Sequence, residues 1–193
     1  MGPLLAISRG IDWVTRVIGR AVSWLVLVAV LVSAVNAIIR KAFDMSSNSW
    51  LELQWYLFGA VFLLAAAHTL QENEHIRIDI FYGTRSKRTQ DRIDLFGHLF
   101  FTLPFCLLMV WLLSPYVANS VRIQEYSPNS GGLILWPAKA LLLAGFVLLT
   151  LQVISEIIKR IAIMAGIIED PNPPASGHPP LEMTDAQKGD DHV

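Results

Sequence analysis

Four long stretches that are almost free of charged residues constrain this chain more than any other feature of its sequence. A helix needs about 20 apolar residues to cross the hydrocarbon core of a bilayer. Each stretch meets that need, and the third has spare length that it can use by tilting. The sequence therefore predicts an all-α integral membrane protein with a four-helix transmembrane domain over residues 21–165. The predicted spans are residues 21–39, 53–71, 95–119 and 133–155, with Lys139 as their one Lys, Arg, Asp or Glu.

The composition agrees with a membrane protein rather than a soluble one. Hydrophobic residues make up 53% of the chain and charged residues 16%, against about 25% charged residues in soluble domains. The single cysteine, Cys106, lies inside the third stretch, so no internal disulfide and no cysteine-rich metal site can form. We expect Cys106 to pack as a small apolar residue.

Residues 1–20 carry a helical pattern of their own. Apolar residues recur there every three or four positions, with charged residues between them. The pattern predicts an amphipathic helix that lies at the membrane interface. A cytoplasmic extension of the first transmembrane helix is the alternative. A cleaved signal peptide is disfavoured, because twenty residues are a long n-region. The apolar positions are Leu4, Ile7, Ile11, Val14 and Ile18.

The C-terminal segment, residues 166–193, differs from the rest of the chain. It is rich in proline and acidic residues and has few large apolar ones. Such a segment cannot bury enough apolar surface to fold, so we expect a disordered cytoplasmic tail.

The distribution of basic residues predicts the orientation of the chain. Ten lysines and arginines lie before the first span, between the second and third, or just after the fourth, against four at the other ends of the spans. Basic residues near span ends favour the cytoplasm. We therefore expect both termini in the cytoplasm and the loops 40–52 and 122–132 on the opposite side.

The sequence offers few groups for chemistry. It has no phosphate-binding glycine loop, nucleophile elbow or zinc-type His/Cys spacing, so we expect no enzyme activity, no cofactor, no metal and no nucleic-acid partner. His68 and His98 lie near the cytoplasmic ends of the second and third spans. If these spans were antiparallel neighbours, the two histidines could hold a haem; alternatively, they are polar residues near the interface. Asn36 is expected to hydrogen-bond between helices, and Pro104 to bend its helix.

Glu52 stands where the second span begins, close in sequence to Arg40 and Lys41. Two readings remain open: an ion pair with one of these cations, or a solvated acid favoured by the helix dipole. Tryptophans near the span ends are expected to anchor the helices at the membrane surfaces, where membrane lipid is their partner. They are Trp13, Trp55 and Trp136.

The second span and the segments around it resemble a known family. A W-x-E beginning, an interior glycine, an H-I-R-I-D exit and a later S-P-N-S-G-G string are similar to the small permease (DctQ-type) subunit of tripartite ATP-independent periplasmic (TRAP) transporters. The resemblance covers roughly residues 11–165, and the proline-rich tail departs from the family's usual short ending. The residues that carry it are Trp50, Glu52, Gly59, residues 75–79, residues 127–132 and Trp136-Pro137.

The resemblance implies a role as a non-catalytic subunit in the bacterial inner membrane. Its partners would be a large membrane permease subunit, which imports an organic acid with sodium, and a periplasmic solute-binding protein. The resemblance also implies that the small subunit braces the stationary scaffold of the large one, and small residues in its spans would allow the close helix contact that this requires. The alternatives are an autonomous four-helix transporter and a haem-bearing anchor of a redox complex. The expected contact residues are Trp50, Glu52, Gly59, His75, Arg77, Asp79 and Gly145.

Overall fold

The computed structural model of the protein describes residues 2–44, 47–72 and 87–168. Within these ranges the chain is helical apart from its connections, and an isolated antiparallel bridge between Tyr126 and Ile134 is its one β-type pairing. The elements are α1 (Gly2–Phe43), α2 (Asn48–Gln71), α4 (Lys87–Gly97), the π-helix η1 (His98–Thr102), α5 (Leu103–Arg122) and α6 (Trp136–Met164).

Four of the described helical segments are long and apolar enough to cross a membrane: α1, α2, the continuous run from Arg88 to Arg122, and α6. The prediction of an all-α membrane protein with four transmembrane helices is therefore confirmed. The helices extend beyond the predicted spans at all but two ends: α2 ends at Gln71, as the second span was predicted to, and α6 begins at Trp136, three residues after the predicted start of the fourth span.

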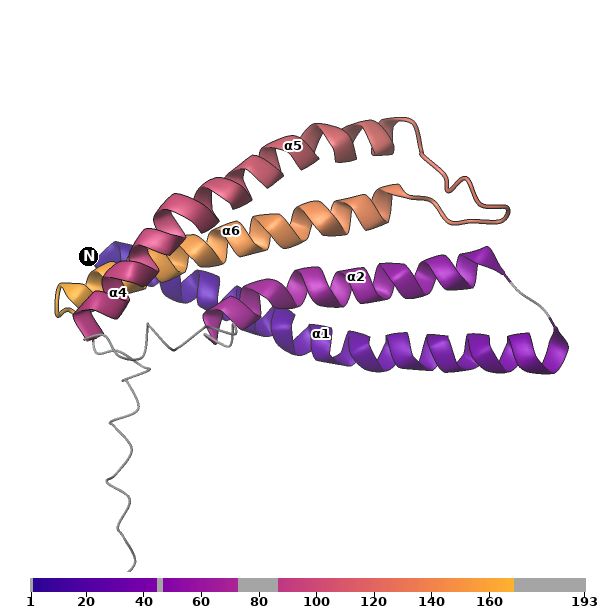
Figure 1. Ribbon diagram of the computed structural model, residues 1–193, viewed down its shortest axis with the longest axis horizontal. Helices are drawn as coiled ribbons and strands as arrows, with labels where there is room; N and C mark the ends of the chain where they lie inside the picture. Colours follow the sequence, from indigo (N-terminus) through magenta and orange to yellow (C-terminus); the bar gives the residue numbers. More distant parts are fainter. Residues whose placement is uncertain (1, 45–46, 73–86, 169–193) are drawn as a thin grey trace, which may run out of the picture.

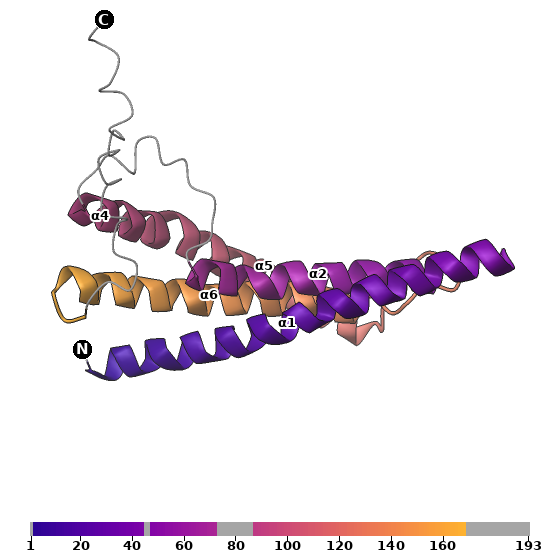
Figure 2. The same cartoon turned by 90° about the horizontal axis from the view of Figure 1, so that it is seen from below.

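Helix α6 is the central element of the bundle. It packs against α1, α2 and α5, and α1 also packs against α2. Figure 1 shows α6 between α5 and α2, and Figure 2 shows α1 running past both α6 and α2. The third span therefore packs mainly against the fourth span and not against the second.

The N-terminal segment is part of α1, which continues without a break from Gly2 to Phe43. The predicted helix over residues 1–20 is thus present, but no turn separates it from the first span. Its buried positions are mostly small and recur close to every seven residues, which places them on one face of the helix. Small residues let helix backbones approach closely, so this face forms the seam against α2 and α6. The buried residues are Ser8, Thr15, Gly19, Val22 and Ala29.

The third span contains a π-helical turn, which precedes Pro104. Proline has no backbone N–H and its ring crowds the carbonyl four residues earlier. The wider turn at His98–Thr102 lies where that conflict arises, and the Thr102 hydroxyl donates a hydrogen bond to the Gly97 carbonyl at 3.4 Å. Figure 1 shows the run from α4 to α5 as an arched helix, as expected when a π-turn and prolines interrupt the ladder.

Candidate scaffold ties and partner surface

Glu52 connects the beginning of α2 to the loop between α5 and α6. Its carboxylate accepts hydrogen bonds from the Asn129 side-chain amide at 2.8 Å, from the Leu133 backbone N–H at 2.6 Å and from the Ser127 hydroxyl. Hydrogen bonds to a charged acceptor are about twice as strong as neutral ones. These four residues, called here the Glu52 cluster, fix the loop over the beginning of α2.

Three further hydrogen bonds from α2 reach the same loop. Asn48 donates to the Ser130 carbonyl at 2.9 Å, Ser49 donates to the Gly131 carbonyl, and the Tyr56 hydroxyl donates to the Ile134 carbonyl at 3.0 Å. The loop carbonyls are thus paired with side chains from the first and third turns of a single helix.

The Glu52 cluster corrects the sequence-based interpretation of this acid. Among the described residues, Glu52 forms no ion pair with Arg40 or Lys41, and its carboxylate is not simply solvated. The sequence showed the W-x-E beginning and the loop string separately, but nothing in either indicates that the loop folds back over α2.

Gly132 permits this close approach. A Cβ atom at this position would lie 2.6 Å from the Ser127 Cβ and 2.8 Å from a Glu52 carboxylate oxygen. Both distances are too short for real contacts, so glycine is required where the loop passes the carboxylate.

A second tie joins α5, the loop and α6. The Lys139 ammonium pairs with Glu125 and lies 4.0 Å from the centre of the Tyr116 ring. Glu125 also accepts a hydrogen bond from the Ser120 hydroxyl. The Lys139 and Ser120 hydrogen bonds hold the pKa of Glu125 below its ordinary value of 4.5, so the acid is ionised at neutral pH. The charge that interrupts the fourth predicted span is therefore neutralised inside the protein.

At the other end of the bundle, Asp12 on α1 connects to α6. It accepts hydrogen bonds from Gln152 at 2.9 Å and from Ser155 at 2.8 Å, and it pairs with the Lys159 ammonium at 3.2 Å. Ser8, one turn earlier on α1, shares a 2.7 Å hydrogen bond with Ser155. These five residues form the Asp12 cluster. Interhelical hydrogen bonds in membrane proteins contribute about 0.6 kcal/mol on average, so several are needed to dock the first half of α1.

Arg160 connects α6 to α4 at the same end. Its guanidinium reaches Asp91 at 2.8 Å and Asp94 at 3.1 Å, and the side chains of all three are about nine-tenths buried or more. One planar donor group thus bridges two carboxylates from successive turns of α4, a geometry that arginine supports and lysine does not.

The Asp12 cluster and the Arg160 bridge were not predicted from the sequence. Spacings of three or four residues place Ser8 with Asp12 on one face of α1, and Ser155 with Lys159 on one face of α6. That periodicity was readable, but which two polar faces meet depends on the packing order of the helices.

The two glycines expected at a partner surface have different surroundings. Gly145 is buried, and a Cβ there would lie 2.8 Å from the Leu63 Cβ and 3.1 Å from the Leu63 carbonyl oxygen. Gly145 therefore packs within the chain and is not available to a partner. At Gly59 a Cβ would meet nothing within 4 Å, so this position faces open space.

Gly59 lies between two exposed aromatic side chains on α2. Trp55 and Phe62 are each 77% exposed, and their spacing from Gly59 of four and three residues places all three on one helix face. We call this face the Gly59 notch. Trp50, near the beginning of α2, is also exposed.

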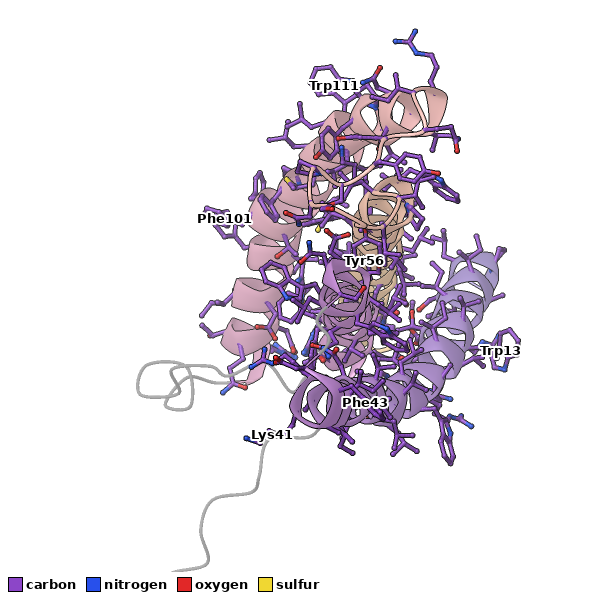
Figure 3. All side chains as sticks on the ribbon, turned by 90° about the vertical axis from the view of Figure 1, so that its right-hand side faces the viewer. Trp13, Lys41, Phe43, Tyr56, Phe101 and Trp111 are labelled. Atoms are coloured by element: carbon purple, nitrogen blue, oxygen red, sulfur yellow. The ribbon has the colours of Figure 1, made fainter. Side chains whose placement is uncertain are left out.

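Other large side chains also point away from the bundle. Figure 3 shows Phe101 and Trp111 directed outward from the third span and Trp13 directed outward from α1 on the opposite side. The three side chains are 67%, 73% and 64% exposed. Trp136 is half-buried at the start of α6. Placement of Trp13, Trp55 and Trp136 at membrane surfaces stays a prediction.

Some expected site residues fall outside this description. His75, Arg77 and Asp79 lie outside the described residues.

His68 packs on α1, since a Cβ at Gly19 would lie 2.5 Å from its ring. Helix α2 packs chiefly on α1 and α6, whereas η1, which carries His98, packs on α4, α5 and α6. The arrangement that a haem between the second and third spans requires is therefore not formed.

Replacing Glu52 with glutamine should loosen the loop. A neutral amide cannot accept all of the hydrogen bonds that the carboxylate accepts, and its NH₂ group faces other donors. We expect amide hydrogen exchange of residues 127–135 to accelerate about tenfold, measured by mass spectrometry in detergent micelles. Glu72→Gln is the control, because Glu72 is remote from the loop. Unchanged protection in E52Q would show that the cluster does not hold the loop.

Comparison with known proteins identifies the chain's relatives. The family model described as "Tripartite ATP-independent periplasmic transporters, DctQ component" matches residues 29–162. No curated protein and no solved structure matched the chain. The match includes the whole of α2 and α5, the loop that Glu52 holds, all of α6 except its last two residues, and only the part of α1 from residue 29 onward. The chain belongs to the DctQ family, the small membrane component of tripartite ATP-independent periplasmic transporters.

Proposed function

We propose that this chain braces the stationary scaffold of a large membrane permease subunit, which imports an organic acid together with sodium. A periplasmic solute-binding protein delivers the solute. The observation that carries the proposal is the family match over residues 29–162. The ties support a brace, because the Glu52 and Asp12 clusters and the Arg160 bridge join the helices at both ends of the bundle.

The Gly59 notch is the proposed contact with the large subunit. Between helices in lipid the hydrophobic effect supplies little driving force, so close packing decides affinity. A small residue flanked by Trp55 and Phe62 gives a partner helix a place to approach closely. Neither α1 nor α6 covers these two aromatics, which are each 77% exposed. Arg77 and Asp79 are proposed to fix the register of the contact by their charges.

We further propose that the chain lies in the bacterial inner membrane with both termini in the cytoplasm, as the excess of basic residues favours. In a Cys106→Ala background, a single cysteine at Ser130 should react with an impermeant maleimide in intact cells whose outer membrane is permeable. A single cysteine at Ser86 should react only after the inner membrane is opened. The reverse pattern would refute this orientation.

Reconstituted alone, the chain should move no solute. Proteoliposomes with an inward sodium gradient would be tested with a panel of radiolabelled carboxylates, first with this subunit alone and then with the large subunit and the binding protein added. We expect uptake above empty liposomes only in the complete system. Sodium-dependent uptake by the single subunit would refute the proposal and favour an autonomous transporter.

A further inference from the structure

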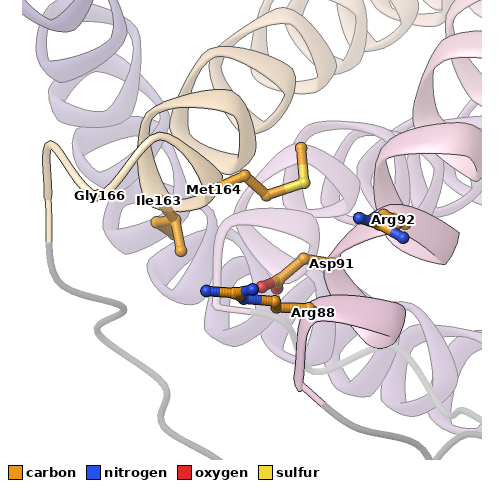
Figure 4. A pocket seen from close by; sticks show the side chains of 6 residues that line it. All are labelled: Arg88, Asp91, Arg92, Ile163, Met164 and Gly166. Carbon is orange, nitrogen blue, oxygen red and sulfur yellow. The ribbon is translucent and has the colours of Figure 1, made fainter.

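A pocket of about 510 Å³ opens between α4 and the C-terminal end of α6. Figure 4 shows the side chains that line it, with arginines from α4 on one side and apolar residues from α6 on the other. Of its lining residues, Asp91 alone takes part in a contact described above, the Arg160 bridge. Its lining residues are Arg88, Asp91, Arg92, Ile163, Met164 and Gly166.

The pocket holds two positive charges that have no acidic partner among residues 2–44, 47–72 and 87–168. Arg88 and Arg92 are exposed and stand four residues apart on α4, so they share one helix face. Neither forms an ion pair with any residue in the described part of the chain. Asp91 also lines the pocket, but its carboxylate is bound to Arg160. The free positive charge therefore dominates at the mouth of the pocket.

The opposite wall is apolar. Ile163 and Met164 end α6, and Met164 is 40% exposed. A ligand that fills the pocket thus meets guanidinium groups on one side and hydrocarbon on the other, which suits an amphipathic anion better than a simple ion.

The predicted third span places the pocket at the outer part of the lipid headgroup layer. The predicted third span starts at residue 95, three residues after Arg92 and seven after Arg88. At 1.5 Å of rise per residue the two arginines lie about 5 and about 10 Å beyond the hydrocarbon core. The headgroup layer extends about 5–8 Å on each side of that core, so the Arg92 backbone lies within it and the Arg88 backbone just beyond it, from where the long side chain reaches back toward the phosphates.

We propose that this pocket binds the phosphate of an anionic phospholipid of the phosphatidylglycerol class, with an acyl chain along Ile163 and Met164. Guanidinium groups pair with phosphate oxygens in a planar, two-pronged geometry. Arg88 and Arg92 would hold the phosphate, and Arg160 remains with its two aspartates. With the proposed orientation of the chain, the lipid belongs to the cytoplasmic leaflet.

The test is lipid binding to the delipidated full-length protein in mild detergent, followed by native mass spectrometry during titration with phosphatidylglycerol. The double variant R88Q/R92Q should bind the first phosphatidylglycerol about tenfold more weakly or worse, as expected for two basic residues near a headgroup. The matched control is R16Q/R20Q. It removes the same charge at the same spacing from exposed positions on α1 that do not line this pocket, and it should change binding less than about twofold.

Three outcomes would overturn the proposal. Equal affinity of R88Q/R92Q and the parent protein for phosphatidylglycerol would show that the two arginines do not bind the lipid. Displacement of the lipid by an equal concentration of glycerol phosphate or inorganic phosphate would show a free-phosphate site. Lipid binding that appears only after removal of residues 169–193 would show that the acidic tail is the occupant. Unchanged circular dichroism of both double variants excludes misfolding. We expect both variants to co-purify normally with the permease, so this test is independent of the proposed function.

Discussion

Replacing Gly145 with leucine should sharply lower the yield of folded small subunit expressed alone, whereas replacing Gly59 with leucine should leave that yield unchanged. At Gly145 even a Cβ atom would lie 2.8 Å from Leu63 and 3.1 Å from its backbone carbonyl, which cannot move without shifting α2. Inserting extra atoms into a packed interface costs about 1–3 kcal/mol and sometimes more, and here two central helices would have to separate. At Gly59 a Cβ meets nothing.

The same pair of variants separates a fold defect from an interface defect. Co-expressed with the large permease subunit, G59L should give normal amounts of small subunit but reduced recovery of the complex, and uptake should fall in proportion. Gly59→Ala is the mild control and should retain most of the complex, since a methyl group leaves most of the notch open. The measurements are the monodisperse yield of the single subunit, the ratio of subunits after affinity purification and the uptake rate.

Two results would contradict this interpretation. Full recovery of the complex and full uptake with G59L would show that the partner contacts another face of the chain. A normal yield of G145L alone would show that α2 and α6 are not packed as tightly at Leu63 as the structure indicates.

The sequence predicted the helices far better than their contacts. Four uncharged stretches of sufficient length require four membrane-spanning helices, because backbone polar groups in lipid must be paired within each segment. Nothing in those stretches shows that α6, and not α2, is the neighbour of α5. Packing order depends on which small residues face each other. The sequence does not distinguish Gly59 from Gly145, although Gly59 faces open space and Gly145 packs against Leu63.

The candidate site was predicted in the same uneven way. Glu52 and residues 127–132 were both recognised, but as separate features, because their contact spans more than seventy residues. Asp12 was read as part of the polar face of an amphipathic helix, although in the structure it binds Gln152, Ser155 and Lys159. Polar residues near span ends serve equally well as solvated groups and as helix ties, and only the tertiary structure distinguishes the two uses.

Replacing Arg160 with leucine should weaken the packing of α4 on α6 by about 3–5 kcal/mol, which is the cost of removing one partner from a buried ion pair. Asp91 and Asp94 would then face each other with side chains that are 5% and 8% exposed. Two neighbouring carboxylates without their shared cation repel each other, and α4 should move away from α6. Thermal unfolding of the purified protein in detergent measures the loss, and R20L, which changes an exposed arginine on α1, is the control.

The triple variant D91N/D94N/R160L decides whether the loss comes from charge or from packing. Neutral amides remove the repulsion, and replacing a whole buried ion-pair network is often close to neutral in stability, unlike breaking it. The triple variant should therefore recover most of the stability that R160L loses. If it is as unstable as R160L, the arginine acts by filling space between α4 and α6, and the ionic bridge contributes little. If R160L itself matches R20L, α4 does not depend on this bridge for its position, and other contacts of α4 and η1 with α6 must hold the third span in place.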